Sequence, residues 1–269
     1  MKDYKAIFEA VESSLFDVGS RRVPREQIAG SLEPSKHLEG KRFADDECYM
    51  KLVHIVFYSG FKAEIVTKKR PIIDEHFPNY KTVSGFGARD IERILHDDRM
   101  IRNASKIIAC VENAKTLRRV IEKYGSFQAW LDSLPYPESD REIIDLREEF
   151  RRRFKFLGKR VAFHFMTDLG LPVLKPDRVI ERIFKRLDLV PRDFEGDKLY
   201  VSLIQEGRKF AKATGYPIRY VDRVFVAYGQ TQTTDMGLDR GICLENNPSC
   251  STCGATRYCG YYAQRQKAS

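Results

Sequence analysis

The chain has 269 residues, of which 42% are hydrophobic, and this length can bury one large core or two smaller ones. Its formal net charge of +9 at pH 7 indicates a polyanionic partner. The longest apolar stretch, residues 52–61, is too short for a membrane-spanning helix, and the N-terminus lacks the apolar core of a signal peptide. We therefore expect no membrane association.

Nearly every segment with a hydrophobic period has the period of an α-helix, and the alternation of a β-strand is almost absent. These patterns predict an all-α fold. The expected helices cover residues 4–17, 45–67, 88–96, 103–123, 126–132, 139–153, 158–168, 176–187, 198–213 and 217–228. Glycines and prolines, including Pro71, separate the helices, and residues 18–44 are expected to form an irregular connector.

The chain is expected to form two lobes. Residues 43–170 make a central helical bundle, whereas residues 1–42 and 171–269 together make a second helical lobe. Cys48 and Cys110 each lie in an apolar helical segment, so we expect buried thiols, which suit the reducing cytoplasm. No feature indicates an oligomer, and we expect a monomer.

Four cysteines near the end of the chain have the spacing C-x6-C-x2-C-x5-C: Cys243, Cys250, Cys253 and Cys259. Thiolates this close repel one another and oxidise readily unless a soft metal binds them. Structural zinc usually takes two short C-x2–4-C pairs, but only one pair here is that close. The longer arms favour a 4Fe–4S cluster in the loop 243–259, with zinc and a disulfide as the alternatives.

A tight turn lies between two helical segments at residues 139–168. The turn opens the second helix at Gly158, where free backbone N–H groups and the positive end of the helix dipole can hold a phosphate. Such a hairpin binds the DNA backbone without reading sequence, although an ordinary helix–helix turn is the alternative for this segment alone. The residues expected to contact DNA here are Lys155, Leu157, Gly158, Lys159 and Arg160.

Two longer motifs and the cysteine spacing carry a family resemblance. The motifs F-K-F-L-G-x-x-x-A-F-x-F-M-x-x-x-G-L at 154–171 and I-R-N-x-S-K-I-x-A-x-x-x-N-A at 101–114 resemble 3-methyladenine DNA glycosylase I. The cysteine loop and the helix before it resemble endonuclease III instead, although Phe156 stands where the pattern L-P-G-x-G of that family has its first glycine. Both families are helix-hairpin-helix DNA glycosylases.

The resemblance implies a DNA N-glycosylase of base-excision repair. Such an enzyme binds double-stranded DNA containing a damaged base, flips that base out and hydrolyses its N-glycosidic bond. The implied location is the cytoplasm, in association with the nucleoid.

Asp177 begins the helical segment after the hairpin, at the place of the superfamily's catalytic aspartate. Cleavage of the glycosidic bond develops positive charge on the deoxyribose, and a carboxylate stabilises that charge and can orient water. The structural alternative for Asp177 is a helix N-cap. Lyase members of the superfamily use a lysine where this chain has Arg160, which stays protonated. We therefore expect a monofunctional enzyme, with a lyase using Lys175 or Lys159 as the alternative.

The resemblance also implies residues that face the flipped base. Phe61 is the candidate plug for the gap in the duplex, with Tyr58 and Lys62 beside it, and a core position is the alternative for Phe61. Met100 and Ile101 are candidates for a wedge on the opposite strand.

The identity of the base is less constrained by the sequence. Ile55 and Ala63 stand where 3-methyladenine DNA glycosylase I has its acidic base-contacting residue and its stacking tryptophan. A neutral aromatic pocket around Tyr58 and Phe61 can still bind a cationic alkylpurine by cation–π attraction. An alkylated base of the 3-methyladenine type is therefore expected first. Uracil, hypoxanthine, oxidised bases, or a DNA-binding module without excision are the alternatives.

Overall fold

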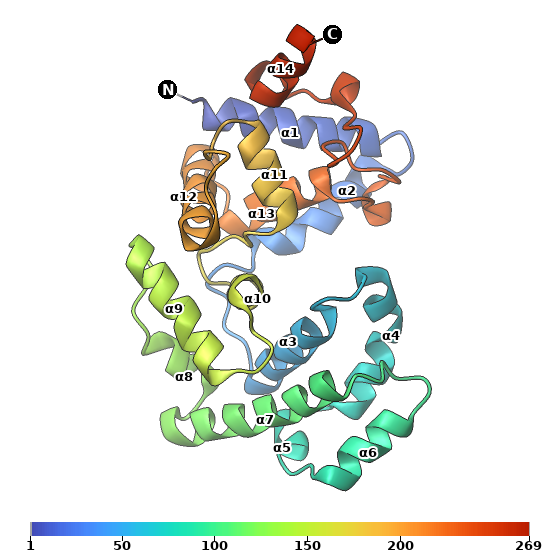
Figure 1. Ribbon diagram of the computed structural model, residues 1–269, viewed down its shortest axis with the longest axis vertical. Helices are drawn as coiled ribbons and strands as arrows, with labels where there is room; N and C mark the ends of the chain where they lie inside the picture. The colour runs from blue at the N-terminus through green and yellow to red at the C-terminus, as the bar shows by residue number, and fades with distance from the viewer. Residues whose placement is uncertain (1, 269) are drawn as a thin grey trace. The chain divides into compact units, whose positions relative to one another are not determined.

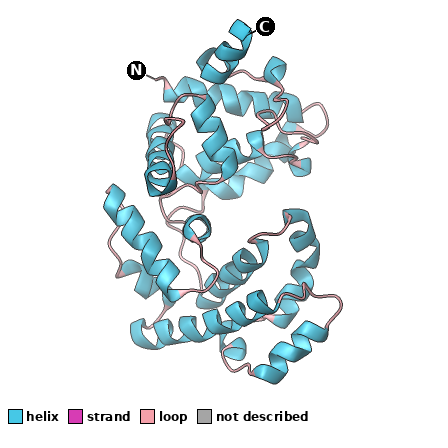
Figure 2. Ribbon diagram, viewed as in Figure 1, coloured by secondary structure: helices cyan, strands magenta, loops and turns pink. Residues whose placement is uncertain are grey.

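The computed structural model describes residues 2–268, and over that range it is built from helices and connecting loops (Figure 2). Between these limits the only strand-like pairing is an isolated bridge between Thr233 and Leu238. The prediction of an all-α fold is confirmed. None of the described helices is long and apolar enough to cross a membrane.

The chain divides into two compact units. Unit 1 comprises Met1–Lys41 and Gly170–Ser269, and unit 2 comprises Arg42–Leu169. The helices of unit 2 are α3 (Asp45–Tyr58), α4 (Ala63–His76), α5 (Tyr80–Val83), α6 (Ala88–His96), α7 (Ala104–Tyr124), α8 (Phe127–Asp132), α9 (Asp140–Arg153) and α10 (Lys159–Asp168). Those of unit 1 are α1 (Tyr4–Gly19), α2 (Arg25–Leu32), α11 (Arg178–Arg186), α12 (Gly196–Thr214), α13 (Ile218–Gly229) and α14 (Gly260–Ala268), with the 3-10 helices η1 (Glu33–Lys36), η2 (Thr234–Met236), η3 (Cys250–Thr252) and η4 (Thr256–Tyr258).

Helix α7 is the central element of unit 2 and contacts α3, α5, α6 and α8 (Figure 1). Asn103 starts α7 because its side chain accepts a hydrogen bond from the N–H of Lys106 at 3.1 Å. The helix buries one face, which carries Ile107, Cys110 and Leu117. Burial of this apolar face holds the unit together.

An aromatic cluster fixes the helical hairpin α9–α10 within unit 2. The cluster consists of Phe127, Trp130, Phe150, Phe154 and Phe165, all of which are buried. Its tightest contacts include Phe127 with Trp130 at 5.0 Å between ring centroids and Trp130 with Phe150 at 5.2 Å. Because α8, α9, α10 and the turn all contribute rings, the hairpin cannot move without disturbing this core.

Unit 1 packs α1 against α12 and α13, and α11 against α13. Helix α11 comes very close to α13 at Gly229, where an added Cβ would lie 2.7 Å from both Val179 Cγ1 and Ile183 Cδ1. Only glycine permits this approach. The close packing sets the position of the N-terminus of α11, where Asp177 lies.

Three expectations about helix boundaries were wrong. The apolar segment 45–67 is two helices, because Gly60 adopts a left-handed φ of 76° and breaks the chain after Tyr58. Pro71 lies inside α4 instead of between helices. Residues 18–44 contain α2 and η1, whose few buried side chains, such as Ile28 and Leu32, leave too weak a period to recognise.

Candidate functional site

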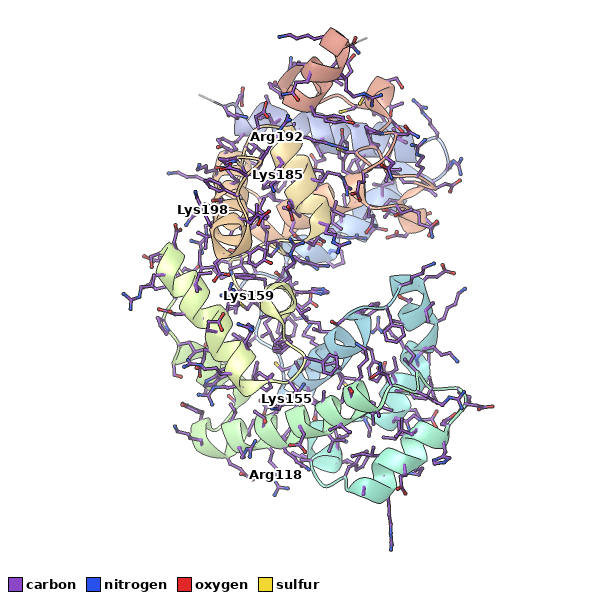
Figure 3. The ribbon with its side chains drawn as sticks, in the orientation of Figure 1. Arg118, Lys155, Lys159, Lys185, Arg192 and Lys198 are labelled. Atoms are coloured by element: carbon purple, nitrogen blue, oxygen red, sulfur yellow. The ribbon has the colours of Figure 1, made fainter. Side chains whose placement is uncertain are left out.

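The hairpin turn leaves the backbone N–H groups at the start of α10 without a side-chain cap, which is the arrangement that can bind an anion. Gly158 is the N-cap of α10, and no side chain caps this helix. Asn113 of α7 fixes the turn with two hydrogen bonds to the backbone of Lys155. Its side-chain oxygen accepts from the Lys155 N–H at 2.7 Å, and its side-chain amide donates to the Lys155 carbonyl at 3.2 Å. Leu157 is buried, so it anchors the turn. Figure 3 labels Lys155 and Lys159, which flank the turn and supply positive charge next to the helix N-terminus.

Phe156, which stands where the endonuclease III pattern has its first glycine, adopts a backbone conformation that favours glycine. Its φ of 65° lies in the left-handed region, which is uncommon for a residue with a Cβ. The buried neighbours Phe154 and Leu157 fix the chain on both sides of it. The turn therefore carries a large aromatic side chain at a left-handed position, and the Phe156 ring is 38% exposed.

A buried lysine lies beside this ring. The Lys106 ammonium donates hydrogen bonds to the carbonyl oxygens of Val56 and, at 2.6 Å, Ser59, at the end of α3. It lies 5.3 Å from the Phe61 ring centroid and 4.9 Å from that of Phe156. Phe61, Lys106 and Phe156 form what we call the aromatic–lysine cluster. Lys106 is only 3% exposed, and burial lowers the pKa of its ammonium.

Sequence reasoning missed Lys106, Asn113 and the role of Phe156. A signal was present, because Lys106 and Asn113 are polar residues on the otherwise apolar face of α7. Polar side chains on such a face are buried only with specific partners. Their partners are backbone groups 47 and 42 residues away, at the end of α3 and in the hairpin turn, which no local pattern reveals.

The candidate base-contacting residues divide into exposed and buried ones. Phe61 is 37% exposed, so the alternative of a core position does not apply. Lys62 is exposed at the start of α4, and the Tyr58 hydroxyl is hydrogen-bonded to that of Thr67 at 2.8 Å.

Met100 and Ile101, expected as a wedge, are 4% and 9% exposed. That expectation needs correction, because neither side chain could enter DNA without leaving the core. Ile55 is buried as well, so it offers no surface to a base. The side chain of Ala63 lies outside the part of the chain that the structure describes.

Asp177 caps α11. Its Oδ1 accepts from the N–H groups of Val179 at 2.8 Å and Ile180 at 3.0 Å, whereas Oδ2 lies 3.5 Å from Lys175 Nζ. The carboxylate is 20% exposed. Asp177 is therefore an N-cap, as the structural alternative proposed, but capping uses only Oδ1 and leaves Oδ2 near the surface. A carboxylate held in this way has a fixed orientation and remains accessible.

Asp222, which sequence reasoning missed, contacts the segment that leads into Asp177. It is buried on α13, accepts from the Lys175 N–H at 3.1 Å and pairs with Arg219. Burial raises the pKa of Asp222, while the Arg219 charge opposes that rise. Asp222 thus anchors the segment leading into Asp177.

The cysteine loop is joined to unit 1 by hydrogen bonds that involve its sulfur atoms. The Tyr228 hydroxyl donates to Cys253 Sγ at 2.8 Å, Arg186 Nη1 donates to Cys243 Sγ at 3.4 Å, and the Tyr262 N–H donates to Cys259 Sγ at 3.4 Å. All four thiols are partly exposed and none forms a disulfide.

Four thiols that accept N–H and O–H hydrogen bonds are a donor set that would fit an iron–sulfur cluster. Cluster-bound thiolates typically accept hydrogen bonds of this kind. Burial raises the pKa of the Cys253 thiol, and the charges of Cys243 and Cys250 act in the same direction. The conformation described over residues 2–268 does not bring three His, Cys, Asp or Glu side chains close enough to hold a single metal ion.

The all-helical architecture, the hairpin and the aspartate after it define the class of helix-hairpin-helix DNA glycosylases. Residues 40–175, half of the chain, match the methyladenine glycosylase family. The chain belongs to this family and is a DNA N-glycosylase.

Two solved structures of DNA glycosylases have a similar fold. Endonuclease III in a trapped covalent intermediate with DNA is 16% identical, with a TM-score of 0.54, and the match covers 90% of this chain and 94% of that one. The 8-oxoguanine DNA glycosylase of Thermotoga maritima is 18% identical, with a TM-score of 0.50 and coverage of 82% and 96%. 3-Methyladenine DNA glycosylase I from Staphylococcus aureus is 23% identical, with a TM-score of 0.43, over 51% of this chain and 82% of that one.

Proposed function

We propose that the chain is a monofunctional base-excision glycosylase that acts as a monomer on double-stranded DNA and uses Asp177 as its catalytic carboxylate. The observation that carries this proposal is the position of Asp177 at the N-terminus of α11, with one oxygen held by two backbone N–H groups and the other near the surface. A carboxylate that is already oriented stabilises the positive charge of the departing sugar without reorganising. Its second oxygen can also orient the attacking water.

The lysines near Asp177 support hydrolysis over a lyase reaction. The Lys175 ammonium lies 3.5 Å from Asp177 Oδ2, so it forms an ion pair with the carboxylate that the reaction uses. Arg160 occupies the second position of α10, and a guanidinium does not form a Schiff base. The product of hydrolysis is an abasic site.

The hairpin supplies the DNA-backbone contact in this proposal. The uncapped N-terminus of α10 at Gly158 receives a phosphate, and Lys155, Lys159 and Arg160 add the positive charge that attracts it. These contacts position the duplex and carry no sequence information. The family and the aromatic residues near Phe61 support a damaged base as the target. An alkylated, 3-methyladenine-type base is the first lesion to test, and uracil, hypoxanthine and oxidised bases are the alternatives.

A 4Fe–4S cluster is proposed for the four thiols of the loop: Cys243, Cys250, Cys253 and Cys259. When bound, it would cross-link the loop to itself and order it, which is a structural role. The donors from Tyr228, Arg186 and Tyr262 then stabilise the thiolates. The experiment is an iron and sulfide determination on anaerobically purified protein. A colourless preparation that contains zinc would contradict the cluster and leave the fold untouched.

The excision proposal is tested with labelled duplexes that each carry one lesion: 3-methyladenine, 7-methylguanine, uracil, hypoxanthine or an oxidised base. Each reaction is split, with and without alkaline cleavage. Strand breaks that appear only after alkali support monofunctional excision, and breaks without alkali demonstrate a lyase.

The role of Asp177 is tested with Asp177→Asn, which preserves a good N-cap. We expect excision to fall at least about a hundredfold while duplex binding stays within about twofold. Asp3→Asn is the matched control, because Asp3 also caps a helix and accepts from the Ala6 N–H at 3.0 Å. Unchanged excision in Asp177→Asn would assign Asp177 a capping role only.

A further inference from the structure

We propose that Tyr228 raises the reduction potential of the cluster bound by the cysteine loop, because its hydroxyl donates a hydrogen bond to Cys253 Sγ. This inference rests on the proposed 4Fe–4S cluster and adds a property that does not follow from the spacing of the cysteines. All the residues concerned belong to unit 1.

Tyr228 contacts the cysteine loop with both its backbone and its side chain. It lies in the last turn of α13, where a helix leaves carbonyl groups without partners inside the helix. Its carbonyl accepts hydrogen bonds from the N–H groups of Ile242 at 2.8 Å and Cys243 at 3.1 Å. Its hydroxyl lies 2.8 Å from Cys253 Sγ. One residue is thus bonded to the first and to the third cysteine of the loop, which fixes the ring relative to both.

The direction of the hydrogen bond follows from the chemistry of its two partners. A thiolate that binds iron carries no proton and can only accept, so the phenol must donate. Tyr228 is 2% exposed, so bulk water does not compete for the hydroxyl or the sulfur. A buried tyrosine hydroxyl needs such a partner, and a hydrogen bond to a charged acceptor is strong where the surroundings have low polarity.

This bond favours the reduced form of the cluster. Addition of one electron makes the iron–sulfur unit and its thiolates more negative, so a donor to sulfur stabilises the reduced form more than the oxidised form. Replacement of Tyr228 by phenylalanine removes the donor and keeps the ring. The void that remains is about the size of one oxygen atom, which is too small for a water molecule to take over the hydrogen bond.

Other contacts to the sulfur atoms cannot be isolated in this way. Arg186 donates to Cys243 Sγ at 3.4 Å, but its guanidinium also donates to the carbonyls of Leu244 at 2.6 Å and Glu245 at 2.9 Å. Its replacement would therefore change the path of the loop as well as the charge beside the sulfur. The donor of Tyr262 is a backbone N–H, which a change of side chain does not remove.

The test compares three proteins purified anaerobically: the wild type, Tyr228→Phe and Tyr220→Phe. Tyr220 provides the matched control, because it is also a buried residue of α13, and its hydroxyl donates to Glu12 Oε1 at 2.6 Å instead of to a sulfur. Each protein is titrated with dithionite as the reductant and ferricyanide as the oxidant, and the one-electron change is followed by electron paramagnetic resonance. Iron and sulfide contents and the thermal unfolding midpoint show whether each variant keeps the cluster and the fold.

We expect Tyr228→Phe to lower the ratio of reduced to oxidised cluster about tenfold at a fixed potential, which is a potential lower by about 59 mV for one electron. Tyr220→Phe should keep the wild-type potential. Equal potentials in all three proteins would overturn the inference and leave the cluster intact. Loss of iron from Tyr228→Phe, with the unfolding midpoint unchanged, would assign Tyr228 to retention of the cluster and would also overturn the inference. A wild type without iron and sulfide would overturn the proposed cluster itself.

Discussion

Replacing Phe156 by alanine or by glycine tests whether the hairpin turn holds a strained residue. Both changes remove the ring, so the difference between the two variants reports mainly the backbone. In most positions glycine lowers the free energy of unfolding by about 0.5–1 kcal/mol relative to alanine, because the unfolded chain gains freedom. At a φ of 65°, however, a Cβ costs about 1–2 kcal/mol. We therefore expect Phe156→Gly to be more stable than Phe156→Ala by about 0.5–1 kcal/mol.

The assay is urea unfolding followed by circular dichroism, with equal dependence on urea required in both variants. The control pair is Ser105→Ala and Ser105→Gly, at an exposed position of the regular helix α7, where alanine should be the more stable residue. If Phe156→Ala equals or exceeds Phe156→Gly in stability, the turn does not depend on the left-handed conformation, and the comparison with the glycine of the endonuclease III pattern loses its physical basis.

Three further predictions concern the cores of the two units. Burial raises the pKa of Cys48 to about 12 and also raises the pKa of Cys110. Iodoacetamide at pH 8 should therefore leave both thiols unmodified in the folded protein and modify both in urea, as measured by mass spectrometry. Rapid labelling of the folded chain would disprove their burial. Phe150→Ala should lower the free energy of unfolding by about 3–5 kcal/mol, because it opens a cavity in the aromatic cluster, and a loss below about 1 kcal/mol would mean that the hairpin is not anchored there. Gly229→Ala should destabilise the protein by about 1–3 kcal/mol and slow excision, because the new methyl group displaces α11 and with it Asp177; wild-type values for both would contradict the close packing of α11 on α13.

Hydrophobic periodicity predicted the class of the fold, because almost every helix has an apolar face. It failed at residues 45–67, where apolar side chains continue through the turn and only the left-handed Gly60 separates α3 from α4. A backbone conformation of this kind leaves no trace in an apolar pattern. Met100 and Ile101 show the opposite problem: the resemblance suggested a wedge on the opposite strand, whereas packing buries both side chains.

The candidate site was predictable where chemistry depends on residue type and local position. Asp177 and Gly158 belong to this kind, since a helix start can be recognised from the chain alone. Lys106 and Asp222 could not be assigned in this way. Their partners, the Ser59 carbonyl and the Lys175 N–H, are 47 residues away along the chain in each case, so only the folded structure brings them together.

The hydrogen bond from the Gly40 N–H to the Gly170 carbonyl, 3.0 Å long, has a consequence for how this protein can change. It ties together the two segments of unit 1 that lead into and out of unit 2, so the chain leaves unit 1 and returns to it at one place. Insertions with adjacent ends are the kind that a host domain tolerates best. Unit 2, which carries the aromatic–lysine cluster, is thus one continuous segment between the two parts of unit 1, which contains Asp177 and the cysteine loop. Exchange of residues 42–169 for another helical bundle requires only two peptide joints, so unit 2 can change while Asp177 keeps its place in unit 1.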